Sequence, residues 1–346
     1  MPRKGGSNRT TLTEVARAAG VSPATASMVL SGKGEDVRIA SATAARVRAV
    51  ALDLDYSPNL LVRSLQQGST GVLAFFSAFR VVSDEDAYMD RMNRVLERAA
   101  GRRGYDLLIH CAYDRPIEET YRAINGGRAD GLVLFAPRPD DPILALMRRS
   151  RLPCVLLNTR DPEGVLPSVK DDYENGMALV AQALVQNGHR RIACVHVGPN
   201  DSPDAAERIA ALDRSLAELG VVRPEGLTIN LQHRLNTAIE ELVTSPEPPT
   251  AIFCCTDHIA YHCLVALDRL GVRIPEQLSL IGYDGIRWPF DVSHRAASVV
   301  VDFNAQATAA VGLLLDGCER GDSVTIPTSF DPGTTLGPIS STQRSN

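Results

Sequence analysis

The sequence predicts a multidomain protein in which a small all-α module precedes a large α/β body of two doubly wound lobes. Three observations support this prediction. The 346 residues are too many for one small domain, and a hydrophobic content of 44% is ample for a sizeable core. Helical patterns with short apolar faces fill the first 58 residues. From Gly71 onward, apolar runs alternate with amphipathic stretches, and the alternation restarts near Gly176, as expected for two parallel sheets with covered faces.

The N-terminal module centres on two short helices joined by a glycine turn. The first helix has one apolar face, formed by Leu12, Val15, Ala16 and Ala19. Gly20 supplies the turn, Ser22 is a natural N-cap, and Pro23 suits the first helical position. Apolar residues of the second helix are Ala26, Val29 and Leu30. This pattern is typical of a helix-turn-helix, whose second helix enters the DNA major groove. A small helical hairpin packed on a larger core is the alternative.

A third helix is expected from about Ser41 to Asp53, after a loop over 31–36. Pro58 ends this module. Residues 59–65 could form one or two helical turns, which are too few to be stable alone.

Five short motifs of this region resemble the headpiece and hinge of the lac-repressor family of bacterial transcription regulators. They are Leu12–Ala16, Gly20–Ser22, Thr25–Ser27, Tyr56–Asn59 and Val62–Leu65. The resemblance implies that the hinge folds only on operator DNA, where Leu65 would wedge into the minor groove and kink the central step. A plain linker leucine is the alternative. The family usually has Ser at the position of Ala40 and Ala at that of Val62.

The body contains two successive sets of predicted strands and helices. In the first set the strands are Gly71–Phe76, Asp106–His110, Gly131–Phe135 and Cys154–Leu157, with a helix over Met89–Gly104. The second set comprises helices Gly176–Asn187 and Ala205–Leu219 and strands Ile192–His196, Ala251–Cys255, Leu278–Tyr283 and Ala297–Val301. Strand–helix alternation of this kind predicts a parallel sheet in each lobe, with a cleft between the lobes.

Further motifs of the body resemble the family's periplasmic-binding-protein-like core, namely Ser168–Gly176, Asn187–Ala193, Thr256–Asp257 and Ile274–Gly285. On this likeness the chain crosses between the lobes near 173, 302 and 327. The implied division is a headpiece over 1–58, a hinge and linker over 59–70, an N-terminal lobe over 71–173 plus 303–327, and a C-terminal lobe over 174–302 plus 328–341.

Charge is distributed unevenly along the chain. Residues 1–70 carry nine Lys/Arg and five Asp/Glu, whereas the other 276 carry 27 and 36. A basic headpiece on an acidic body suits a protein in which only the headpiece should attract phosphates. The seven cysteines show no metal-ligand spacing and most lie in apolar runs, which favours a reducing cytoplasm. Without a signal-peptide pattern or a long apolar run, we expect a cytoplasmic, nucleoid-associated protein without membrane contact.

The resemblance assigns DNA contacts to the second helix and its flanks. Positions that touch base edges fall on Pro23, Ala24 and Met28, of which none makes the bidentate hydrogen bonds of Arg, Asn or Gln. Sequence discrimination would then rest more on the hinge wedge and on DNA deformability. Hydroxyl side chains at phosphate-contacting positions are Ser22, Thr25, Ser27 and Ser31. Ordinary capping and solvation are the alternative for these four.

The same resemblance implies a small polar, sugar-like effector in the interlobe cleft. Arg208 matches the arginine that grips ligand hydroxyls or carboxylates, and Asp284 matches a ligand-binding acid after a strand. Other candidates for this site are Phe75, Ser77, Tyr88, Phe135, Thr256, Asp257 and Trp288. Thr256 departs from the family's usual Asn, and Asn158-Thr159 from its usual Asp-Arg. The aromatic residues could equally pack in the core, and Trp288 at a subunit interface.

No catalytic constellation, metal motif or cofactor motif is visible in the sequence. Asp171-Asp172 lacks the further ligands that a metal site needs. We therefore expect a non-enzymatic, ligand-responsive repressor that binds a palindromic operator as a homodimer. An exported solute-binding protein of the same body fold and an α/β enzyme are the rival interpretations. The polar tail, Gly337–Asn346, lacks leucine heptads, so no tetramer-forming coiled coil is expected.

Overall fold

A computed structural model of the 346-residue chain describes residues 10–31, 39–59, 64, 68–78, 87–110, 115–197, 204–231, 235–287 and 294–339. The chain forms two compact units, Met1–Thr70 and Gly71–Asn346. Most of the predicted hinge, including Leu65, lies outside the described residues, as does Trp288.

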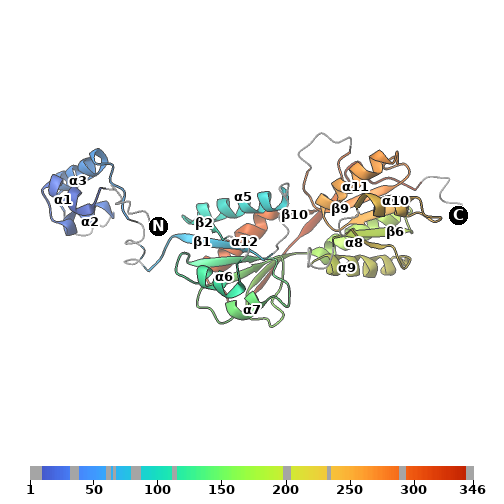
Figure 1. Cartoon of the computed structure of the whole chain (residues 1–346), viewed down its shortest axis with the longest axis horizontal. Coiled ribbons are helices and arrows are strands. Elements are labelled where there is room, and N and C mark those ends of the chain that lie inside the picture. The colour runs from blue at the N-terminus through green and yellow to red at the C-terminus, as the bar shows by residue number, and fades with distance from the viewer. Residues whose placement is uncertain are drawn as a thin grey trace. The chain divides into compact units, whose positions relative to one another are not determined.

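The described residues of the first unit include the helices α1 (Leu12–Ala19), α2 (Pro23–Leu30) and α3 (Ser41–Asp53) (Figure 1). Helix α1 begins with a capping box, because the Thr11 side chain accepts from the Glu14 backbone N–H and the Glu14 carboxylate accepts from that of Thr11. It ends at Gly20, whose φ of 66° requires a residue without a Cβ. Helix α3 begins after Ala40 with no side-chain cap.

Buried side chains of these three helices form one small core, which consists of Val15, Ala16, Ala19, Ala26, Val29, Val47 and Ala51. The predicted helix-turn-helix is therefore confirmed as a fold. Its core is shallow because most members are alanine or valine, so caps and turns contribute a large share of its stability.

The first sheet of the second unit has the strand order β11-β5-β4-β3-β1-β2, and each described pair is parallel. Its strands are β1 (Val72–Ser77), β2 (Asp106–Ile109), β3 (Gly131–Phe135), β4 (Cys154–Leu157), β5 (Ser168–Asp171) and β11 (Ser323–Ile326). Helices of this lobe are α5 (Ala87–Arg102), α6 (Ile117–Ile124), α7 (Pro142–Met147) and α12 (Phe303–Leu315), which pack around the sheet (Figure 1).

The second sheet has the order β12-β10-β9-β8-β6-β7. Its strands are β6 (Ile192–His196), β7 (Thr228–Asn230), β8 (Ala251–Cys254), β9 (Ser279–Asp284), β10 (Ala297–Val301) and β12 (Thr328–Asp331), with helices α8 (Tyr173–Gln186), α9 (Ala205–Glu218), α10 (Leu235–Val243) and α11 (Asp257–Arg269). Only β12 runs antiparallel, to β10, among the described pairs. Two doubly wound lobes thus confirm the predicted fold class.

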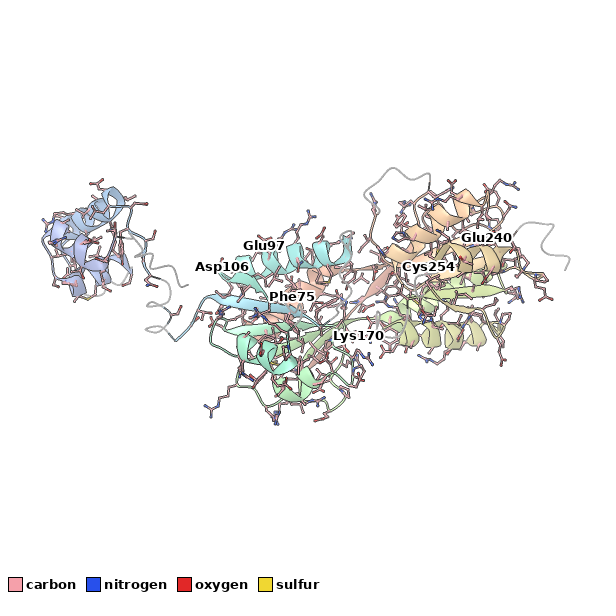
Figure 2. The ribbon with its side chains drawn as sticks, in the orientation of Figure 1. Phe75, Glu97, Asp106, Lys170, Glu240 and Cys254 are labelled. Atoms are coloured by element: carbon pink, nitrogen blue, oxygen red, sulfur yellow. The ribbon has the colours of Figure 1, made fainter. Side chains whose placement is uncertain are left out.

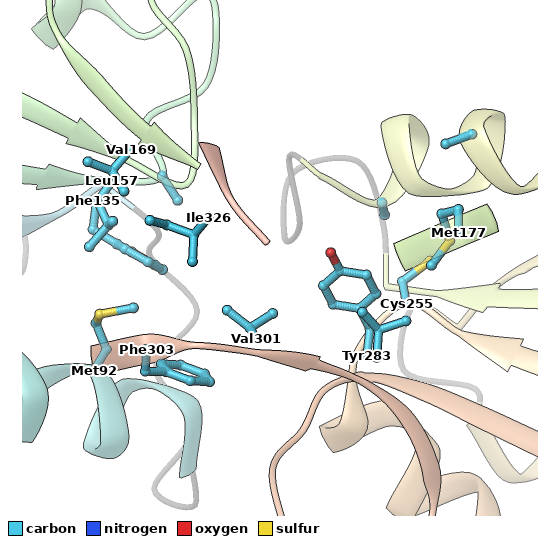
Figure 3. Packing of buried hydrophobic residues seen from close by; sticks show 14 of the residues in the cluster. Met92, Phe135, Leu157, Val169, Met177, Cys255, Tyr283, Val301, Phe303 and Ile326 are labelled. Carbon is cyan, nitrogen blue, oxygen red and sulfur yellow. The ribbon is translucent and has the colours of Figure 1, made fainter. Parts of the chain in front are cut away.

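The chain passes between the lobes three times, because β5 and α8, β10 and α12, and β11 and β12 are consecutive elements of different lobes. One apolar cluster continues across these crossings and includes side chains of both sheets. Figure 3 shows Val301 and Ile326 between the two groups of buried residues. The lobes therefore share a core at the crossings, so moving one against the other must repack these side chains.

Element bounds differ from the predicted ones by a few residues where caps decide them. Helix α8 begins at Tyr173 rather than Gly176 because the Asp172 carboxylate accepts from the Asn175 backbone N–H and fixes the first turn. Strand β8 ends at Cys254, since Thr256 already caps α11 by accepting from the Ile259 N–H.

Candidate DNA-binding surface and interlobe site

The start of helix α2 is exposed and rich in hydroxyl groups. Ser22 caps the helix, since its Oγ accepts from the Thr25 backbone N–H at 3.1 Å. The same Oγ lies 2.8 Å from the Thr25 Oγ1. Pro23 and Ala24 are exposed beside this cap. A helix N-terminus with exposed hydroxyl groups is a favourable place for a phosphate.

The remaining predicted DNA contacts lie along α2 and at its C-terminus. Ser27 and Met28 are partly exposed, and the Ser31 hydroxyl donates to the Met28 carbonyl at 3.2 Å. The hydroxyl groups of Ser22, Thr25 and Ser31 make local hydrogen bonds, which is the alternative role that the sequence left open. Contact with DNA stays a prediction for all of these residues and for Leu65.

Arg208 of α9 is the centre of a buried polar cluster in the second lobe, close to the lobe junction. Its Nη1 donates to the Cys255 carbonyl at 2.7 Å and lies 3.9 Å from the Asp284 Oδ1. Its Nη2 lies 3.5 Å from the Asp204 Oδ2, and its guanidinium lies 3.7 Å from the centroid of the Tyr283 ring. The structure thus brings together Arg208 and Asp284, which the sequence assigned to one site. We call Arg208, Asp204, Asp284 and Tyr283 the arginine cluster.

Two contacts join this cluster to the first lobe. The Tyr283 hydroxyl donates to the carboxylate of Asp171 at the end of β5. Lys170, beside it on β5, forms an ion pair with Glu207 of α9. Figure 2 shows Lys170 at the junction of the lobes, and Figure 3 shows the Tyr283 hydroxyl directed toward the first lobe.

Burial shapes the electrostatics of the arginine cluster. Burial raises the pKa of Asp284 well above its ordinary value despite Arg208, and it raises the pKa of Asp204 to about 6. Burial alone would lower the pKa of Arg208, but Tyr283, Asp204 and Asp284 raise it above its ordinary value. Arg208 is therefore a permanent buried cation, whereas the acids around it are held less firmly in the charged form.

Aromatic side chains form the first lobe's part of the junction. The Tyr88 ring lies 5.8 Å from that of Phe135 and 4.9 Å from that of Phe303, and Phe75 lies 6.0 Å from Phe135. Phe75, Phe135 and Phe303 are buried, while Tyr88 and Ser77 are partly exposed.

A chain of amides extends from this aromatic group. The Gln306 Nε2 donates to the Asn158 Oδ1 at 3.0 Å, and the Asn158 Nδ2 donates to the Tyr88 hydroxyl. Sequence reasoning did not place Gln306 or Asn158 among the effector candidates. No periodicity identifies Gln306, which lies inside a helix of the returning segment and reaches Asn158 only through the fold.

Among the described residues of the second unit, three residues other than glycine have positive φ, namely Ala136 at 44°, Asn158 at 63° and Asp284 at 113°. Ala136 and Asn158 follow β3 and β4, and Asp284 ends β9. Such conformations cost on the order of 1–3 kcal/mol each and cluster at ligand sites. Carboxyl ends of parallel strands are also where open α/β sheets bind ligands.

Other candidates have local partners. The Thr256 hydroxyl caps α11. Asp257 is buried, and its two carboxylate oxygens accept hydrogen bonds, one from the Ile286 N–H at 2.6 Å and the other from the Ser298 hydroxyl at 2.7 Å. Burial raises the pKa of Asp257 to about 8. An effector role for either residue remains a prediction.

Among the described residues, no group of three or more His, Cys, Asp or Glu side chains is arranged to hold a metal ion. Within the same residues, no helix is both long and apolar enough to cross a membrane.

Two family models match the chain. Residues 11–59 match the bacterial regulatory proteins of the lacI family, and residues 181–342 match the periplasmic binding protein-like domain. The HTH-type transcriptional repressor PurR of Photobacterium profundum is 27% identical over 282 residues, which are 80% of this chain and 82% of PurR. The ribose operon repressor of Escherichia coli K12 is 28% identical over 283 residues, with 80% and 83% covered.

Solved structures share the fold. A Lac repressor dimer bound to operator and the anti-inducer ONPF has a TM-score of 0.80 at 22% identity, covering 95% of this chain and 100% of that one. A complex of the transcriptional regulator CelR with cellobiose has a TM-score of 0.67 at 22% identity, covering 94% and 100%.

A helix-turn-helix unit joined to a two-lobed binding-protein-like unit defines the class of ligand-responsive DNA-binding transcription regulators. Within that class, residues 11–59 match the lacI family of bacterial regulatory proteins, and the chain is similar over 80% of its length to the repressor PurR. Its relatives are repressors rather than enzymes.

Proposed function

We propose that this protein is a repressor that binds a palindromic operator as a homodimer and that a small, neutral, polyhydroxylated effector between its lobes changes operator affinity. The observation that carries the effector part is a pair of buried polar atoms. The Nε of Arg208 and the Oε1 of Gln306 have no hydrogen-bond partner among the described residues. An unpaired buried polar atom costs about 1–3 kcal/mol, which a ligand bearing both an acceptor and a donor would recover.

The character of the effector follows from these two atoms and their neighbours. Arg208 Nε needs an acceptor and Gln306 Oε1 needs a donor, and a hydroxyl group is both. Asp171, Asp204 and Asp284 are acids near Arg208, while Lys170 is already paired with Glu207. These acids already accompany the Arg208 cation, so a further carboxylate or phosphate is not needed to balance it, and a neutral polyol is favoured. The aromatic side chains Phe75, Phe135, Tyr88 and Phe303 would cover the apolar face of a sugar ring.

Operator binding is proposed for the surface of α2 and for Leu65. The Lac repressor structure is a dimer on operator DNA, which supports a homodimer here. A repressor of this kind would act in the cytoplasm at the nucleoid and without catalysis. The four-part division at residues 58, 70, 173, 302 and 327 is part of this proposal. An exported solute-binding protein is disfavoured by the helix-turn-helix unit.

Selection from a randomised DNA library with the full chain tests the operator part. We expect a two-fold symmetric sequence, with an affinity that falls steeply as salt rises. Recovery of no enriched sequence, or of an asymmetric one, would contradict the proposal.

A thermal-shift panel of neutral sugars, sugar acids and nucleosides tests the effector part. A stabilising neutral sugar should bind Arg208→Met roughly ten- to a hundred-fold more weakly, because a charge-assisted hydrogen bond is lost. Arg214→Met is the matched control, since Arg214 lies on the same helix with an exposed side chain paired to Glu174. Gln306→Leu should weaken binding without a change of charge. The proposed site would be excluded if only sugar acids stabilised the protein, or if Arg208→Met and Gln306→Leu both bound the neutral sugar as tightly as the wild type does.

A further inference from the structure

Lys170 is a buried cation of the first lobe whose charged partner belongs to the second lobe. It is the last residue but one of β5, and its side chain is only 6% exposed. Its ammonium group forms an ion pair with the carboxylate of Glu207 on α9 and lies 4.4 Å from the centroid of the Tyr173 ring on α8. A buried ammonium group is costly unless such partners stay close to it. Lys170 therefore favours the lobe arrangement in which α8 and α9 cover it.

We call the contact between Lys170 and Glu207 the interlobe pair. A second contact joins the lobes beside it, because Asp171, the last residue of β5, accepts a hydrogen bond from the Tyr283 hydroxyl on β9. The chain then crosses into the second lobe, where α8 begins at Tyr173. A rotation of the lobes that moves α9 away from β5 must therefore break the interlobe pair.

The interlobe pair shares its structural elements with the arginine cluster. Glu207 directly precedes Arg208 in the first turn of α9. Because the hydrogen-bonded turns of a helix move together, a molecule that displaces Arg208 also displaces Glu207. On the other side, Tyr283 bonds to Asp171, and the centroid of its ring lies 3.7 Å from the Arg208 guanidinium. A displacement within the arginine cluster thus reaches the contacts that join the lobes.

The two members of the interlobe pair differ in exposure, which suits a contact that opens and closes. The Glu207 side chain is 50% exposed, so water solvates its carboxylate in either lobe arrangement. Lys170 gains water only when α9 moves away, and this hydration offsets part of the lost ion pair. Breaking the interlobe pair is therefore a moderate loss, which the differential affinity of a small ligand for the two arrangements can match.

We propose that the interlobe pair holds the two lobes of the unliganded protein in the arrangement described above and opens when the lobes rotate. It is a conformational device built into the fold, and its test needs neither effector nor DNA. The behaviour of the unliganded lobes is therefore separate from the effector and the operator proposed above.

Single-molecule energy transfer in the full chain measures the lobe arrangement. Fluorophores are attached through unnatural amino acids in place of Arg122 on α6 of the first lobe and Glu240 on α10 of the second, both of which are exposed (Figure 2 labels Glu240). Labelled chains are mixed with an excess of unlabelled chain, so that transfer within one chain is observed. We expect one dominant distance in the wild type and a minor population at another distance.

Glu207→Gln removes the ion pair and keeps an oxygen that accepts a hydrogen bond from Lys170, so this variant should fold. We expect it to raise the minor population by roughly three- to ten-fold, since one partner is buried and the other half exposed. Lys170→Met replaces the buried cation by an apolar side chain of similar length. In that background Glu207→Gln should have no further effect, because the contact that it removes is already absent.

Glu174→Gln is the matched control. Glu174 is an acid of α8 with a 53% exposed side chain, and it pairs with Arg214 of α9. This variant removes the same charge from an ion pair that lies within the second lobe. We expect its distribution of distances to equal that of the wild type.

Three results would overturn the proposal. The first is a distribution of distances in Glu207→Gln that equals that of the wild type. The second is an equal change in Glu174→Gln, which would show an effect of net charge. The third is an equal effect of Glu207→Gln with Lys170 and with Met at position 170, which would show that Glu207 acts without Lys170.

Discussion

The helix-turn-helix unit and the two-lobed unit place their polar groups in opposite ways. Among the described residues of the first unit, every buried side chain is apolar, and the hydroxyl groups of α2 lie at the surface or partly exposed. The two-lobed unit buries Lys170, Asp171, Arg208, Asp257 and Asp284. The first arrangement suits an extended polyanion that meets the surface, and the second suits a small molecule enclosed by protein.

Because of this difference, we expect the stability of the first unit to depend mainly on single core side chains and that of the two-lobed unit to depend also on pH. A shallow apolar core loses its stability when one side chain is changed, because few other contacts remain. A buried ionised cluster depends on protonation, because each charge must keep its partner. The following variants test these two expectations.

The largest expected effect is on the small core. Val47 is fully buried between the helices of the first unit, whereas Ala49, two residues along α3, is exposed. Val47→Asp places an unpaired carboxylate in this core, so we expect the unit to unfold and operator affinity to fall by roughly a hundred-fold or more. Fluorescence anisotropy with operator DNA measures this fall.

Ala49→Asp is the control, and it should retain a folded first unit. The melting temperature of the two-lobed unit should be the same in both variants, because residues 1–70 form a separate compact unit. A lower melting temperature of the two-lobed unit in Val47→Asp would mean that the two units fold together.

An intermediate effect is expected from Asp257. Its pKa is 3.8 ordinarily and about 8 when buried in the fold, so the folded state holds the proton more tightly than the unfolded state. The resulting stability is fully present below about pH 4 and is lost as pH rises toward 8, at up to about 1.4 kcal/mol per pH unit.

Asp257→Asn should remove this dependence, since an amide can donate to the Ser298 hydroxyl and accept from the Ile286 N–H as a protonated acid does. Denaturant unfolding of the wild type and the variant from pH 5 to pH 9 measures the difference in the free energy of unfolding. We expect the free energy of unfolding of the variant to increase relative to that of the wild type as pH rises. A constant difference would show that Asp257 stays ionised throughout.

The smallest effect distinguishes capping from DNA contact. Thr11→Ala and Ser22→Ala each remove a side-chain cap, of α1 and of α2, which costs about 0.5–2 kcal/mol. If Ser22 also contacts a phosphate, Ser22→Ala should lower operator affinity several-fold more than Thr11→Ala at equal loss of stability. Melting curves and anisotropy titrations of both variants measure the two quantities. Equal operator affinities of the two variants would show that Ser22 caps α2 and does not contact a phosphate.

Local signals were sufficient for the first unit. Gly20, Ser22 and Pro23 specify a turn, a cap and a first helical position from their own chemistry, and the predicted third helix matches α3. Strand–helix alternation likewise predicted two parallel sheets, because a strand buried on both faces must be apolar along its whole length.

Only the tertiary structure decided which polar groups meet. The Tyr283 hydroxyl reaches Asp171 across 112 positions of sequence, and Gln306 reaches Asn158 across 148. The structure also showed that Lys170 of β5 pairs with Glu207 of α9, across 37 positions. Spacing along a chain reports periodicity within one helix or strand, whereas these contacts depend on strand order and on three crossings between the lobes. That is why Arg208 and Asp284 were paired by resemblance to a family, while the contact of Gln306 with Asn158 and the ion pair of Lys170 with Glu207 became visible only in the folded chain.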